Sequence, residues 1–197
     1  MNGKWRWNGL QIKAQAITYT QFHICNSMLD PDMFLLQMCS TQLSSSVFLK
    51  SVLECFNVFH LLSLSSSNQE QEQADFMMES ALIFLTSVIT LRTNLGLPEQ
   101  DLPKLEMLSL LFMKDQTFSQ LKDHMPQKPN KDELYDEDIE RYLNEVSTSI
   151  APPEGSLQQR MYAPKQEMWE TMYDPIHVWL RAGDKQDFQN SLERFYS

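Results

Sequence analysis

The sequence predicts a mainly α-helical protein, and three observations support this fold class. Only 5 of the 197 residues are glycine, which is too few for the turns of an all-β barrel. Hydrophobic residues make up 42% of the chain and aromatic residues 11%, so most of the chain is expected to fold around a core. Apolar residues recur at helical spacing in both halves, and the length allows one or two domains.

The first half predicts a helical scaffold at residues 30–96, after an irregular segment at 1–29. Asp30 can cap a helix and Pro31 suits the first helical position, so they predict a helix at 30–43. A second helix follows the apolar spacing of its phenylalanines to about residue 62 and pairs with the first as a hairpin.

A polar stretch without periodicity, SLSSSNQEQEQ at residues 63–73, separates this hairpin from the next helix. Its composition predicts a linker or a surface loop. The long helix that follows is expected at about 74–95, because Gly96 and Pro98 are typical of a helix end.

The second half predicts three helices and then two short strands. The helices are expected at 102–114, 117–124 and 132–147, and the strands at 159–163 and 175–181. In the second strand we expect His177 to point outward. Three helices followed by a β-hairpin is the order of a winged-helix domain, which we place at 97–181.

Residues 182–197 resume a helical stripe through Phe188, Leu192 and Phe195. The stripe reaches the last residue without a glycine or proline to end it. We therefore expect this stretch to be the start of a truncated helix, and the chain to be a segment of a longer polypeptide.

The charge disfavours nucleic acid as a partner. The formal net charge is −10, and a surface of that sign repels phosphate backbones. The third predicted helix of the winged-helix domain, which carries basic residues when such a domain enters DNA, has seven acidic residues within 132–145. We interpret this acidic face as solvated, with docking of a basic partner as the alternative function.

The cysteines and histidines give no metal ligands. Cys25, Cys39 and Cys55 lack CxxC spacing and lie among apolar residues, so we interpret them as buried thiols of a protein in a reducing, cytoplasmic compartment. The closest pair, His23 and Cys25, is interpreted as a packing feature, and His60 as a surface residue.

No catalytic or cofactor-binding residue is predicted, and no membrane segment. The G-x-S-x-G, P-loop and H-E-x-x-H motifs are absent from the sequence, and the longest apolar run, residues 81–91, is about half the length needed to cross a bilayer. Methionine and aromatic residues of the second half are expected in the core: Met107, Phe112, Met113, Trp169 and Trp179.

Two stretches carry a family resemblance. LRTNLGLP at residues 91–98 and, above all, the series Gly-Ser-x-Gln-Gln-x-Met-Tyr-x-Pro-Lys-x-Glu-x-Trp at 155–169, followed by Asp-Pro-Ile at 174–176, resemble the middle region of the UBR-type E3 ubiquitin ligases. The similarity extends more loosely through residues 115–126 and back to 32–36. Arg160 and the segments 63–73 and 131–140 depart from the family pattern.

The resemblance implies a helical scaffold that leads into a winged-helix domain of a larger ligase. Such ligases recognise N-degrons and other degrons through a zinc-binding UBR box, and they use a zinc-binding RING to transfer ubiquitin from a conjugating enzyme to the substrate. Seven cysteines and histidines are too few for a two-zinc RING. We therefore expect a non-catalytic scaffold without a cofactor, whose partners are the rest of the ligase chain and, through it, the conjugating enzyme and degron-bearing substrates. The alternative is a free-standing acidic winged-helix adaptor.

Overall fold

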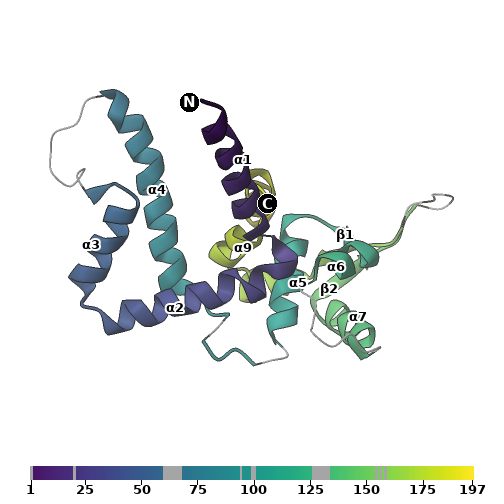
Figure 1. The fold of residues 1–197 in the computed structure, drawn as a ribbon. Helices are drawn as coiled ribbons and strands as arrows, with labels where there is room; N and C mark the ends of the chain where they lie inside the picture. The colour runs from purple at the N-terminus through teal and green to yellow at the C-terminus, as the bar shows by residue number, and fades with distance from the viewer. Residues whose placement is uncertain are drawn as a thin grey trace. The chain divides into compact units, whose positions relative to one another are not determined.

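The computed structural model describes residues 2–19, 21–59, 68–93, 95–98, 101–125, 134–153, 155, 157 and 159–197. It divides into two compact units, one formed by Met1–Asp30 and Leu95–Ser197 and the other by Pro31–Asn94. Figure 1 shows that helices dominate both units and that a small sheet lies in the first. This confirms the predicted mainly helical class, while the predicted limits of the domains remain predictions.

The first unit contains a winged-helix arrangement. Its elements follow one another as α5 (Asp101–Met113), β1 (Gln116–Thr117), α6 (Phe118–His124), α7 (Leu134–Val146), β2 (Ser147–Ile150) and β3 (Met161–Pro164). The strands form an antiparallel sheet in the order β1-β3-β2, and Met161 is the register partner of both Thr117 and Ile150. The β2–β3 hairpin forms the wing (Figure 1). Within it, Gly155 takes a φ of 79°, a left-handed conformation that favours glycine.

The second strand was predicted in the wrong place. Residues 175–181 form helix α9 (Pro175–Arg181), because Asp174 accepts hydrogen bonds from the backbone N–H groups of Ile176 and His177 and Pro175 occupies the first turn. The strand that forms the hairpin with β3 is β2, which follows α7 directly. Two more helices, α8 (Gln166–Thr171) and α10 (Lys185–Tyr196), complete this part of the unit, and α9 and α10 both pack against α5.

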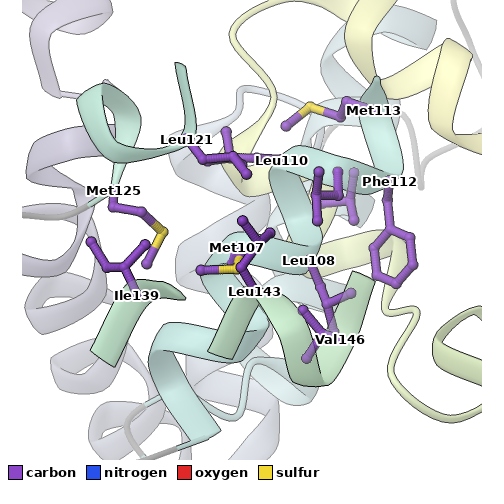
Figure 2. Close-up of a cluster of buried hydrophobic side chains, with 12 residues drawn as sticks. Met107, Leu108, Leu110, Phe112, Met113, Leu121, Met125, Ile139, Leu143 and Val146 are labelled. Atoms are coloured by element: carbon purple, nitrogen blue, oxygen red, sulfur yellow. The ribbon is translucent and has the colours of Figure 1, made fainter. Parts of the chain in front are cut away.

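The hydrophobic core of this unit is built on α5, which is buried on all sides from Glu106 to Met113. The predicted core residues Met107, Phe112 and Met113 are confirmed, with at most 5% of their surface exposed. Figure 2 shows the cluster, in which side chains of α5 meet those of α6 and α7. Trp169 is half-buried, and its ring centroid lies 4.5 Å from that of Phe112. The cluster's buried members are Met107, Leu108, Leu110, Leu111, Phe112, Met113, Leu121, Met125, Ile139, Leu143, Val146 and Val178.

The N-terminal segment was predicted to be irregular, but it is helical. Helix α1 (Asn2–Tyr19) is followed by the 3₁₀ helix η1 (Phe22–Ser27). The sequence prediction missed α1 because it relied on an apolar stripe at helical spacing, which this helix lacks. Residues 2–19 contain no proline, so nothing in them interrupts a helix. In the described part of the chain, no helix is long and apolar enough to span a membrane.

The second unit is helical, as predicted, but its helix limits differ. Helix α2 (Leu29–Gln42) begins one residue before the expected start, and α3 (Ser45–Cys55) ends seven residues short of the expected end, where Asn57 adopts a left-handed φ of 55°. Helix α4 (Asn68–Thr90) includes residues that were predicted as linker. Residues 60–67, which include the end of the predicted second helix and the first part of the predicted linker, lie outside the described residues. Leu53, Val58 and Ala81 form one small buried cluster in this unit.

Candidate functional site

A buried group of charged side chains joins three segments of the first unit. Arg181, near the end of α9, donates from Nε to Oε2 of Glu106 on α5 at 2.8 Å and from Nη2 to Oε1 of Glu106 at 2.7 Å. The same Nη2 donates to Oδ2 of Asp30, at the start of α2, at 2.8 Å. The exposed fractions of the three residues are 2–3%. Paired so closely, these charges hold α9 and the start of α2 to α5.

Two polar residues extend this group along α5 and α9. Ser109 Oγ lies 2.8 Å from His177 Nδ1, and His177 Nε2 lies 3.5 Å from Glu106 Oε1. Ser109 Oγ also donates to the carbonyl oxygen of Leu105 at 2.8 Å. Ser109 and His177 are 1% and 2% exposed. We refer to Asp30, Glu106, Ser109, His177 and Arg181 together as the buried polar cluster.

The pKa values of the cluster show how its charges depend on one another. Burial alone would raise the pKa of Glu106, but Arg181 and His177 lower it from 4.5 to about 2. Burial would lower the pKa of Arg181, but the nearby Glu106 and Asp30 raise it above its ordinary value. For Asp30 burial outweighs the attraction of Arg181, so its pKa is raised. Glu106 and Arg181 are therefore both ionised at neutral pH.

The cluster contains atoms of the kinds used in catalysis, but its geometry does not support a reaction. A serine, a histidine and a carboxylate in series would be the parts of a nucleophilic site. All three are at most 2% exposed, so a substrate cannot reach Ser109 Oγ. An open cleft of about 390 Å³ lies nearby in the same unit, and its walls include Leu110, Gln116 and Arg181 but neither Ser109 nor His177. We assign no catalytic residue.

A metal ion does not fit the cluster either. Donor atoms of Cys25, Asp30 and Glu106 all lie within 4.8 Å of one another, which is close enough for shared coordination. The guanidinium of Arg181, however, already contacts both carboxylates at 2.7–2.8 Å. A cation bound there would have to displace a buried positive charge, so we name no metal ligand among these residues.

The structure changes the interpretation of several predicted residues. His177 was expected on the surface of a strand, but it is buried on α9. Cys25 is buried as predicted. The same prediction is wrong for Cys39, on α2, and Cys55, on α3, which are both exposed. His60 and the side chain of His23 lie outside the described residues.

The acidic face of α7 is present as predicted. Glu137, Glu140 and Glu145 are exposed, while the apolar side of the helix is buried against α5. Part of the negative charge is compensated, since Lys104 Nζ lies 2.6 Å from Glu145 Oε2 and Arg141 lies 2.7 Å from Asp138. The face therefore consists of solvated carboxylates and local ion pairs. Asp132 and the side chain of Asp136 lie outside the described residues.

Sequence reasoning missed the buried polar cluster, although one signal was present. Residues 105–113 (LEMLSLLFM) place Glu106 and Ser109 inside an otherwise continuous apolar stretch. A helix that is apolar on all sides is buried, and a charged residue within it must find a buried partner. The sequence could indicate that such a partner exists, but it could not indicate that the partner is Arg181.

The arrangement α5-β1-α6-α7-β2-β3 defines a winged-helix protein. The family model described as the winged-helix domain of UBR1-like E3 ubiquitin-protein ligases matches residues 103–197. Over 97–98% of its length this chain is 43% identical to an E3 ubiquitin-protein ligase ubr3 of Danio rerio, 41% to UBR3 of Homo sapiens and 42% to Ubr3 of Drosophila melanogaster. The chain belongs to the UBR family of E3 ubiquitin ligases, and it spans about a tenth of the length of these relatives, from 9% to 11%.

Proposed function

We propose that this chain is a non-catalytic scaffold segment of a UBR-type E3 ubiquitin ligase. The observation that carries the proposal is the burial of Ser109, His177 and Glu106, whose reactive groups link α5, α9 and Arg181 instead of facing a substrate. A rigid winged-helix unit of this kind can hold the modules on either side of it in a fixed arrangement.

The whole ligase, under this proposal, transfers ubiquitin from a conjugating enzyme to degron-bearing substrates in the cytoplasm. The similarity to relatives that are named E3 ubiquitin-protein ligases supports this activity. The direct partner of the segment is the rest of the ligase chain. The proposal places the zinc-binding modules outside these 197 residues, because 3 cysteines and 4 histidines cannot supply the ligands of both a UBR box and a RING.

A ubiquitin-discharge assay tests the absence of catalysis. The purified 197-residue chain is added to a conjugating enzyme charged with ubiquitin, and release of ubiquitin to free lysine is followed. We expect the rate without the chain and the rate with it to be the same. Faster discharge that is abolished by Ser109→Ala or His177→Gln would overturn the assignment of a scaffold.

A second assay tests the scaffold role in a full-length UBR ligase that contains this segment. Arg181→Met removes the cation that joins α5, α9 and the start of α2 and should reduce substrate ubiquitination by the intact enzyme. Arg141→Met, which affects an exposed pair on α7, is the matched control and should leave it unchanged. Full activity of an Arg181→Met ligase whose segment is shown to be unfolded would contradict the proposal.

The second candidate function is an adaptor that binds a basic partner through α7. Exposure of Glu137 and Glu140 favours it. Under this alternative, Glu137→Lys together with Glu140→Lys abolishes a salt-sensitive complex with a Lys/Arg-rich peptide, whereas the scaffold proposal expects no such complex at physiological ionic strength. Nucleic acid is disfavoured by the same face, and a salt-sensitive DNA complex would reverse that conclusion.

A further inference from the structure

The buried polar cluster carries two carboxylates but a single permanent cation. Glu106 and Asp30 both contact the guanidinium of Arg181. If both carboxylates are ionised and His177 is neutral, the cluster has a net charge of −1 at a site that is almost completely removed from water. A net charge is unfavourable at a buried site, so one further proton within the cluster would stabilise it.

The hydrogen bonds of Ser109 fix the proton on one nitrogen of His177. Ser109 Oγ lies 2.8 Å from the Leu105 carbonyl oxygen and 2.8 Å from His177 Nδ1, and each contact needs a hydrogen between its two atoms. A hydroxyl supplies one hydrogen, and a carbonyl oxygen supplies none. The Ser109 hydrogen must therefore go to Leu105, and the second hydrogen must come from His177 Nδ1.

The other nitrogen faces a carboxylate. His177 Nε2 lies 3.5 Å from Oε1 of Glu106, a group that stays ionised because Arg181 lies against it. An unprotonated Nε2 would direct its lone pair at this negative oxygen. Among the described residues, His177 Nε2 has no hydrogen bond to another side chain. A proton on Nε2 turns this repulsion into attraction.

We propose that His177 is a buried imidazolium whose second proton neutralises the cluster, so that loss of this proton weakens the attachment of α9 and of the start of α2 to α5. The charges then balance, with Arg181 and His177 opposite Glu106 and Asp30.

Other titratable groups lie near His177 on several elements. Glu106 faces it from α5 and Asp30 from α2, and Arg181 is on its own helix. From η1, the Cys25 thiol interacts with the charge of Arg181. Helix α10 also packs against α9, but its Arg194 is paired with Asp115. Asp30 is the competing position for the proton, because burial raises its pKa.

A nuclear magnetic resonance experiment decides between these positions. Long-range ¹⁵N–¹H correlation spectra of the histidine rings distinguish an imidazolium from either neutral tautomer, and His124, exposed on α6, is the internal reference. We expect the His177 ring to carry protons on both nitrogens at pH 7. A ring with one proton at that pH, whether on Nδ1 or on Nε2, would overturn the proposal.

The pH dependence of unfolding gives a second test. A histidine in an unfolded chain releases its proton near pH 6.5, whereas His177 would keep its proton in the folded state. Above about pH 6.5, as long as His177 keeps its proton, the folded state binds one more proton than the unfolded chain. The unfolding equilibrium constant therefore rises with pH by up to about tenfold per pH unit. His177→Gln should remove this slope, and an unchanged slope in that variant would contradict the proposal.

Ser109→Ala tests the hydrogen-bond argument without removing a charge. Its matched control is Ser87→Ala on α4, a similarly buried serine that also donates to the carbonyl four residues earlier but has no hydrogen bond to a histidine among the described residues. We expect Ser109→Ala to raise the unfolding equilibrium constant on the order of tenfold more than Ser87→Ala. Equal effects would contradict the assignment of the Nδ1 proton through Ser109 and would overturn the proposal.

Discussion

Replacing Arg181 with methionine should destabilise the winged-helix unit more than any exposed substitution on it. The side chain of Arg181 is 0% exposed, and it makes three charge-assisted hydrogen bonds of 2.7–2.8 Å to Glu106 and Asp30. Methionine has a similar length and fills most of the volume, so the main change is the loss of the positive charge and its donors.

The expected size follows from the two carboxylates that remain. At an effective dielectric constant of 20, a pair of unit charges 4 Å apart interacts by about 4 kcal/mol, and removal of one partner of a buried ion pair typically costs about 3–5 kcal/mol. We expect Arg181→Met to lower the free energy of unfolding by about 3–5 kcal/mol. Neutralising both carboxylates as well, with Asp30→Asn and Glu106→Gln added, should recover most of that loss because no buried carboxylate is then left without Arg181.

Equilibrium urea denaturation followed by tryptophan fluorescence measures this change, because Trp169 packs against Phe112 in the same core. Arg141→Met is the control, since the Arg141–Asp138 pair lies exposed on α7 and should contribute nothing measurable. An Arg181→Met variant as stable as the control, or a triple variant no more stable than Arg181→Met alone, would refute the view that the cluster is held by charge pairing.

Three further predictions concern stability. Because the pKa of Glu106 is lowered from 4.5 to about 2, ionised Glu106 stabilises the folded state by about 3 kcal/mol above pH 4.5, and this contribution is lost as the pH falls from 4.5 to about 2. The raised pKa of Asp30 offsets part of it. In urea unfolding measured across this range, Glu106→Gln should reduce the dependence of stability on pH. Leu111→Ala, at a residue with 0% exposure, should cost about 2–5 kcal/mol by the same denaturation assay, and less than 1 kcal/mol would contradict a close-packed core. Thr117→Ala removes the capping box that Thr117 forms with Gln120 and should cost about 1 kcal/mol, seen as a lower thermal midpoint.

The helices of the winged-helix unit could be predicted because local chemistry determines them. Thr117 begins α6 with the side-chain hydrogen bond that its residue type suggests, and Ile139 and Leu143 are buried at the helical spacing of α7. In these places the residue type, the spacing and the observed burial agree.

The strands could not be predicted equally well, because the apolar residues of a short segment can match both the spacing of a strand and the spacing of a helix. In residues 175–181 the alternation of Ile176, Val178 and Leu180 indicates a strand, but the same seven residues form a helix once Asp174 caps them and Pro175 fixes the first turn. The true wing strand, Ser147–Ile150, is short, polar and mostly exposed. It gains its structure from pairing with β3, which no local pattern reveals.

The buried polar cluster depends on contacts between segments that lie far apart in the sequence, and this is why sequence reasoning missed it. Arg181 meets Glu106 across 75 positions and Asp30 across 151. Seen locally, Asp30 suggests a helix cap and His177 an exposed side chain; seen together, they are parts of a single ionic connection. The reactive groups most suggestive of chemistry in this chain are thus engaged in holding helices together. Their removal should therefore change the stability of the winged-helix unit and the pH dependence of that stability.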